Sequence, residues 1–142
     1  FRRSRGLGDV YKRQNISLPL YSSKVPAGFP SPADDHMEGK LDLNTHLIKH
    51  PTATFFVKAS GESMLGAGIH DGDILVVDRS LEPRKGRVVI AAVDGQLTVK
   101  RLQKKGSKTF LVPENKKFRS IELSENNDVM IWGVVTNVIH KV

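Results

Sequence analysis

The alternation of apolar and polar residues after position 53 is typical of short β-strands separated by turns. Residues 88–93 are almost all apolar, which indicates a strand buried on both faces. The dipeptide Asp94-Gly95 is a hairpin signal, so the strand returns after it. Turn residues recur about every 8–12 positions, which predicts a mostly β domain of antiparallel strands. The predicted strands are residues 54–59, 74–78, 88–93, 96–103, 109–112 and, as one strand or two, 129–139.

The chain before position 54 has a different pattern. Four prolines fall within residues 19–32, and this density disfavours a helix and favours extended chain. The spaced apolar residues would let this segment lie on a surface as an arm, although a plain linker would have the same composition. Residues 41–50 then place Leu43, Leu47 and Ile48 on one face, which predicts a short helix ended by Pro51.

The first 14 residues match neither pattern. They include the string SRGLGDVYKRQ, which resembles an adaptor-derived tail, and we interpret them as non-native; a disordered basic arm is the alternative. The predicted organisation is therefore a non-native or disordered tail over 1–14, an extended arm over 15–40, and a β domain over 41–142.

Composition narrows the class of protein. A chain of 142 residues with 39% hydrophobic residues can fill one core. It has no cysteine, which excludes disulfides, thiolate nucleophiles and cysteine-ligated metals. No apolar run approaches the roughly 18 residues of a membrane span, and no signal peptide is visible, so we expect a cytoplasmic protein without membrane association.

The net charge of +7 suggests an acidic partner at first sight. Residues 1–14 carry five basic residues and one acidic residue, a net +4, which leaves only +3 for the rest of the chain. A nucleic-acid binder would also interleave aromatic residues with its basic ones, and this chain has one Trp and two Tyr. We therefore expect no direct sequence-specific DNA binding.

The histidines suggest neither a metal site nor a catalytic triad. His46 and His50 stand four positions apart, but no third ligand accompanies them. Residues 61–65 (GESML) lack the second glycine of the G-x-S-x-G nucleophile motif. The sequence thus predicts no metal and no cofactor, and it disfavours a Ser-His-Asp enzyme.

Ser63 and Lys100 are the candidate catalytic residues. A serine hydroxyl needs a base to take its proton, and a lysine can serve if it is neutral. A free lysine is only about one-thousandth deprotonated at pH 7.4, but burial lowers its pKa. In a strand, Thr98, Lys100 and Leu102 share one face while Arg101 faces elsewhere, so Lys100 can point inward. Taken alone, a solvated strand lysine and a turn serine are simpler interpretations.

Several motifs occur around these two residues in a fixed order. They are SGESM (60–64), GIHDGDIL (68–75), TVKRL (98–102), VPEN (112–115) and GVV (133–135). Together they resemble the LexA/UmuD family of self-cleaving serine–lysine peptidases over about residues 16–140. Residues 28–33 and 42–44 resemble the UmuD branch in particular.

The resemblance implies a fold and a site. The expected fold is the LexA C-terminal-domain or signal-peptidase-like antiparallel β fold, with a short helix and an extended N-terminal arm. Ser63 would be the nucleophile and Lys100 its base. The bond cut would join Ala27 to Gly28, where UmuD proteins often have Cys before the Gly; both side chains are small, so cleavage should not suffer.

The resemblance also implies partners and a function. The expected protein is a homodimer that cleaves itself when a RecA filament on single-stranded DNA binds. Its shortened form would join a UmuC-type subunit in an error-prone translesion DNA polymerase during the SOS response.

Two alternatives stay open. One is a LexA-type repressor fragment that lacks its DNA-binding domain; that domain takes about 60–70 residues, and only 27 precede Gly28. The other is a non-catalytic interaction module, in which Ser63→Ala would change nothing.

Overall fold

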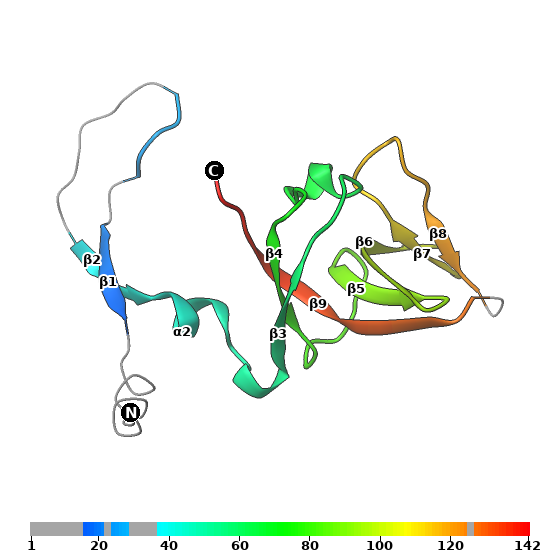
Figure 1. The fold of residues 1–142 in the computed structure, drawn as a ribbon, viewed down its shortest axis with the longest axis horizontal. Coiled ribbons are helices and arrows are strands. Elements are labelled where there is room, and N and C mark those ends of the chain that lie inside the picture. The colour runs from blue at the N-terminus through cyan, green and yellow to red at the C-terminus, as the bar shows by residue number, and fades with distance from the viewer. Residues whose placement is uncertain (1–15, 22–23, 29–36, 125–126) are drawn as a thin grey trace, which may run out of the picture. The chain divides into compact units, whose positions relative to one another are not determined.

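The computed structural model describes residues 16–21, 24–28, 37–124 and 127–142. It divides the chain into two compact units, Phe1–His46 and Leu47–Val142. The predicted tail over residues 1–14 lies outside the described residues. In the first unit, β1 (Ser17–Tyr21) and β2 (Met37–Asp42) form an antiparallel pair (Figure 1).

The second unit contains a seven-stranded antiparallel sheet with the order β3-β4-β9-β5-β6-β7-β8 (Figure 1). The predicted mostly β, antiparallel fold with a short helix is therefore confirmed. The strands are β3 (Thr54–Lys58), β4 (Ile74–Asp78), β5 (Val88–Val93), β6 (Gln96–Lys105), β7 (Lys108–Val112), β8 (Ile121–Leu123) and β9 (Val129–Ile139). Two 3-10 turns, η1 (Pro51–Ala53) and η2 (Leu65–Ala67), flank β3 and the loop that follows it.

The helix is shorter than its sequence pattern predicts. The prediction was residues 41–50, whereas α2 spans Leu43–Leu47 and follows β2 directly. The side chain of Asp42 accounts for the later start, because its Oδ1 accepts the backbone N–H groups of Asn44 at 3.0 Å and Thr45 at 3.4 Å. An aspartate that accepts these first amides marks where a helix begins.

The strand predictions differ from the structure in length and in three omissions: β1 and β2, which pair within the segment predicted as an extended arm and at the start of the predicted helix, and β8. β6 continues to Lys105, two residues beyond its predicted end. The three-residue β8 was not predicted, because so short a strand has too few positions to show a period. Residues 129–139 form one strand, and its register shifts twice, opposite Val76/Val77 of β4 and Ile90/Ala91 of β5.

Two hydrophobic clusters lie on opposite sides of β5. Ile90 belongs to one, and its neighbours Val89 and Ala91 belong to the other, so β5 is buried on both faces as predicted. The cluster on the Ile90 side includes Met64 and Leu75 and forms the floor beneath the loop that follows β3. This cluster positions the candidate site.

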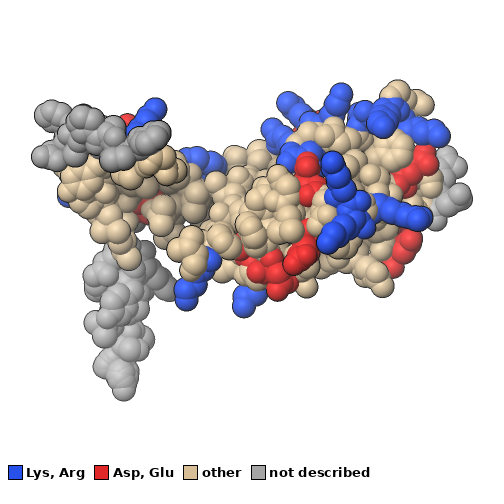
Figure 2. All heavy atoms as spheres, turned by 90° about the horizontal axis from the view of Figure 1, so that it is seen from above, with Lys and Arg blue, Asp and Glu red and all other residues tan. Residues whose placement is uncertain are grey.

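Basic and acidic side chains are intermixed on the visible face of the seven-stranded unit (Figure 2). This pattern differs from the single basic stripe that a nucleic-acid-binding surface would present. Among the described residues, no helix has both the length and the apolar character needed to cross a lipid bilayer.

Candidate active site

Ser63 lies in a loop whose position is fixed by a buried neighbour. After β3, the backbone turns at Gly61, whose φ of 87° is a left-handed conformation that favours glycine. Met64 follows Ser63 and is only 2% exposed, with its side chain in the hydrophobic cluster below. The burial of Met64 therefore anchors the loop and leaves the half-buried Ser63 at its surface.

Two other loops hold the Ser63 loop by hydrogen bonds. On one side, the N–H of Gly61 donates to Asp71 Oδ1 at 2.7 Å. On the other side, the N–H of Glu114 donates to the carbonyl of Ser63 at 2.8 Å, and Asn115 Nδ2 donates to the carbonyl of Glu62 at 2.8 Å. Bonds on both sides of Ser63 limit the conformations of its backbone.

Gly66 allows the close contact between these loops. Its N–H donates to the carbonyl of Glu114 at 2.7 Å. A Cβ atom at position 66 would lie 2.7 Å from that same oxygen, which is closer than real Cβ atoms come to their neighbours. A side chain at this position would therefore push the two loops apart.

Lys100 lies on β6 and faces the interior. It is 9% exposed, and Leu102 on the same face is 6% exposed, as the strand alternation predicts. Arg101 points to the other side, where it forms an ion pair with Glu114 and donates to the carbonyl of Gly86. Two adjacent basic residues thus have different environments, because a strand alternates its faces.

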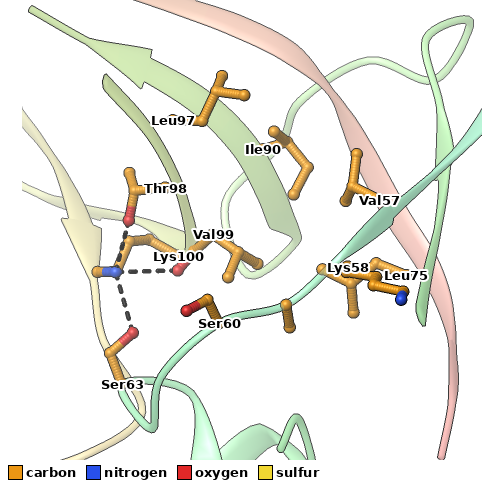
Figure 3. A pocket seen from close by; sticks show the side chains of 11 residues that line it. Val57, Lys58, Ser60, Ser63, Leu75, Ile90, Leu97, Thr98, Val99 and Lys100 are labelled. Carbon is orange, nitrogen blue, oxygen red and sulfur yellow. Dashed lines mark hydrogen bonds between the residues drawn. The ribbon is translucent and has the colours of Figure 1, made fainter. Parts of the chain in front are cut away.

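The structure brings Ser63 and Lys100 together. Lys100 Nζ lies 3.1 Å from Ser63 Oγ, 2.6 Å from Thr98 Oγ1 and 3.1 Å from the carbonyl oxygen of Val99 (Figure 3). A neutral amine has two hydrogens and one lone pair. Since a carbonyl oxygen can only accept, one hydrogen goes to Val99. If the other goes to Thr98, the lone pair is directed toward Ser63 and can accept its proton.

Burial lowers the pKa of Lys100, because removal from water disfavours the charged form. Within the described part of the chain, no carboxylate forms an ion pair with Nζ to offset this effect. The environment therefore increases the neutral fraction of this lysine at neutral pH.

A cleft of about 210 Å³ opens beside the two side chains. Figure 3 shows Ser63, Thr98 and Lys100 at one end, with apolar side chains along the rest. The apolar lining consists of Val57, Leu75, Ile90, Leu97 and Val99. Such a cleft can accept a short apolar stretch of extended peptide next to the Ser63 hydroxyl.

Two strands beside the cleft have backbone edges without a strand partner among the described residues. β3 is the first strand of the sheet and pairs only with β4. β6 pairs with β7 only over residues 101–105, so residues 96–100 pair only with β5. Free strand edges are where an extended peptide can add a strand.

Ala27 and Gly28 lie in the first unit, in a bend outside the strands, and both are exposed. Val25, two residues earlier, is 91% exposed. The expected scissile bond therefore lies in an accessible bend of the chain.

Several residues that position the candidate pair were given no role from the sequence. Thr98 was predicted on the face of Lys100, and its Oγ1 lies 2.6 Å from Nζ. Asn115 lies in the motif 112–115, and Asp71 in 68–75, but both motifs lack a local signal for contact with the Ser63 loop. Elsewhere in the unit, His50 Nδ1 donates to the carboxylate oxygen Oδ2 of Asp78 at 2.6 Å.

A family model and several known proteins match most of this chain. The family model described as Peptidase S24-like matches residues 19–136. Protein SamA of Salmonella typhimurium is 49% identical over 88% of this chain and 86% of its own length. Protein ImpA of Escherichia coli is 49% identical over 87% and 83%, and Protein MucA of Escherichia coli is 44% identical over 85% and 83%.

Proposed function

This chain belongs to the Peptidase S24-like family of serine peptidases, in its UmuD-like branch, which acts in SOS mutagenesis, and on that premise we propose that it cuts its own chain between Ala27 and Gly28. Ser63 is the proposed nucleophile and Lys100 the proposed general base. The observation that carries the proposal is the 3.1 Å separation between Ser63 Oγ and the buried Lys100 Nζ.

The proposed reaction has two steps. Neutral Lys100 takes the proton of Ser63 as Oγ attacks the carbonyl carbon of Ala27, and the protonated amine then gives that proton to the departing nitrogen of Gly28. Water then attacks the resulting ester, with Lys100 again acting as base. Ser63 is regenerated, and the products are a new carboxylate at Ala27 and a new amino terminus at Gly28.

The surroundings of the pair support these roles. Thr98 Oγ1 and the carbonyl of Val99 hold the amine beside Ser63 Oγ. The backbone N–H groups of Glu62 and Ser63 have no hydrogen-bond partner among the described residues, so we assign them to the developing oxyanion. A preorganised donor of this kind costs no reorganisation during the reaction.

The arm suits the cleft as a substrate. Residues 24–28 have no strand partner among the described residues, so their backbone can pair with a free edge of β3 or β6. Glycine at position 28 lets the chain approach the nucleophile closely. A substrate carried on the same polypeptide also has a high effective concentration, so a slow catalyst can suffice.

The proposal extends to partners through the family. We infer that a RecA filament on single-stranded DNA stimulates cleavage by favouring the docked arm, which is a population shift. We also infer that the protein is a homodimer, and that its shortened form is an accessory subunit of a UmuC-type translesion polymerase. Sedimentation at micromolar concentration tests the dimer, and a monomer there would contradict it.

The deciding experiment is incubation of the purified protein at pH ~10 without a partner, alongside Ser63→Ala. High pH deprotonates Lys100 and should substitute for the filament. The expected result is a fragment whose mass begins at Gly28, absent in the variant. An intact chain at pH ~10, and also with a RecA–single-stranded DNA filament, would overturn the proposal and leave an interaction module on a peptidase fold.

A further inference from the structure

Two histidines and an aspartate from separate parts of the second unit meet near the start of β4. His70 and Asp73 lie in the turn before this strand, and His140 follows β9. His140 Nδ1 lies 2.6 Å from Asp73 Oδ1, and His70 Nδ1 lies 3.6 Å from Asp73 Oδ2. The two imidazole rings stack with their centres 4.5 Å apart. One ligand atom from each residue lies within 4.8 Å of the other two.

We propose that His70, Asp73 and His140 bind one divalent transition-metal ion, with Zn²⁺ as the representative ion. Two imidazole nitrogens and a carboxylate oxygen form a donor set that suits Zn²⁺ and its neighbours in the first transition row. Ligand atoms at about 2.0–2.2 Å from a tetrahedral ion stand roughly 3.3 Å apart. The observed separations, 2.6 Å from His140 to Oδ1 and 3.6 Å from His70 to Oδ2, lie on either side of this value, so the donor atoms already stand near the spacing that the ion requires.

The strand register and a backbone hydrogen bond fix the position of the Asp73 carboxylate. Ile74 of β4 is opposite Ile139 of β9, so the strand register brings Asp73 and His140 to the same end of the sheet. The N–H of His70 donates to Asp73 Oδ2 at 2.8 Å. The carboxylate is thus oriented by a backbone hydrogen bond, as metal ligands commonly are.

Access to the site fits an ion that enters from solvent. The side chain of Asp73 is 3% exposed, whereas those of His70 and His140 are 49% and 43% exposed. The buried carboxylate therefore forms the floor and the two imidazoles form an open rim. Such a site leaves room for water or a further ligand on the ion.

A second histidine–aspartate pair in the same unit provides an internal comparison. His50 Nδ1 lies 2.6 Å from Asp78 Oδ2, the same separation as in the pair of His140 and Asp73. The other oxygen of Asp78 accepts the N–H and the hydroxyl of Ser80 rather than facing a second imidazole. Among the residues that the structure describes, only the cluster around Asp73 has three such ligands together.

The proposed metal site is connected to the strand that leads to Ser63. The carbonyl of Asp73 accepts the N–H of Ala59 at 2.8 Å, and the N–H of Gly72 donates to the carbonyl of Ala59 at 2.8 Å. A bound ion would fix the turn 70–73 and, through these bonds, the beginning of the Ser63 loop. Metal binding should therefore raise the thermal unfolding temperature of the protein.

The test is calorimetric titration of the full chain, carrying Ser63→Ala and no histidine tag, with ZnCl₂. The Ser63→Ala background keeps the chain intact, so the result does not depend on self-cleavage. We expect one ion per chain, and we expect His70→Ala and His140→Ala each to weaken binding by at least about tenfold. His50→Ala, the matched control at a pair of equal separation, should leave the affinity unchanged.

Two results would overturn the proposal. One is the absence of any saturable binding with ZnCl₂ or, as a second probe, with CoCl₂ followed by its visible absorption. The other is an unchanged affinity in His140→Ala, which would place the ion elsewhere. Both variants alter exposed side chains, and a thermal unfolding curve without metal will show that each variant is folded.

Discussion

The two units of this chain differ in how much of their surface they bury. In the seven-stranded unit, two hydrophobic clusters fill both sides of the central strands. In the first unit, all five residues of β1 are exposed, and β2 has no buried residue. An isolated pair of strands is only marginally stable in water, whereas a larger sheet with a filled hydrophobic core can be stable by itself. The unit with the candidate nucleophile is therefore rigid, and the unit with the candidate scissile bond can change its conformation at little cost.

This difference suggests where control of the proposed reaction lies. Ser63, Lys100 and Thr98 are already within hydrogen-bond distance in the chain alone. A stimulus need not assemble the catalyst, because only the arm has to find the cleft. Under the proposed function, activation therefore changes the population of docked arms and leaves the catalytic geometry as it is.

The largest effect is expected when the proposed base is removed from the seven-stranded unit. Lys100→Ala should slow self-cleavage at pH ~10 by about 10²–10⁴-fold, the usual contribution of a general base. Lys58→Ala is the matched control, because Lys58 lines the same cleft but is exposed. Fragment formation followed by gel densitometry measures both rates. Cleavage of the Lys100→Ala chain at the normal rate would refute the assignment.

The second prediction concerns pH. Because only neutral Lys100 accepts a proton, the cleavage rate should rise about tenfold per pH unit and level off at the lowered pKa, below the ordinary lysine value. Between the folded and unfolded pKa values the unfolded chain binds more protons, so the free energy of unfolding should also rise with pH. Urea unfolding of Ser63→Ala against Ser63→Ala/Lys100→Met checks this, since the double variant should lack the lysine's contribution. If the free energy of unfolding changed with pH equally in both variants, a depressed pKa of Lys100 would be contradicted.

The third prediction compares the two units by stability. Met64→Ala should lower the free energy of unfolding by about 2–5 kcal/mol, because it leaves a cavity in the core below the Ser63 loop. Val25→Ala in the exposed arm should change it by less than about 0.5 kcal/mol. Urea denaturation of both variants in the Ser63→Ala background gives the difference. Equal effects would show that the arm is packed as firmly as the core.

The smallest expected effect is on the position of the Ser63 loop. Asn115→Ala removes the hydrogen bond to the carbonyl of Glu62, a loss of about 1 kcal/mol that corresponds to a rate roughly fivefold lower. Lys116→Ala, at the next position, is the control. The apparent pKa of the rate profile should stay the same in both variants. A shifted pKa would mean that Asn115 acts on Lys100 rather than on the loop.

Features that repeat along the chain could be predicted from the sequence. The period of two in residues 96–103 predicted that Lys100 and Leu102 point inward, and the apolar run 88–93 predicted a strand buried on both faces. The start of α2 was missed because it depends on one capping side chain, Asp42, rather than on a period. β8 was missed because three residues show no period.

The supports of the candidate site could not be predicted, because they join distant segments. Asn115 contacts Glu62 across 53 positions, and at the proposed metal site His140 contacts Asp73 across 67. Neither residue has a local signal for such a contact. Thr98 differs, because its spacing of two from Lys100 places both side chains on one face of β6.

The uncovered edge of β6 has a consequence for the protein after cleavage. Residues 96–100 have an unpaired backbone edge among the described residues, beside a cleft with apolar walls. Exposed edges of this kind promote unwanted association between copies of a protein, and natural sheets usually protect them. Under the proposed function, an arm bound along this edge would cover it, and cleavage would leave the edge available to a strand of another chain.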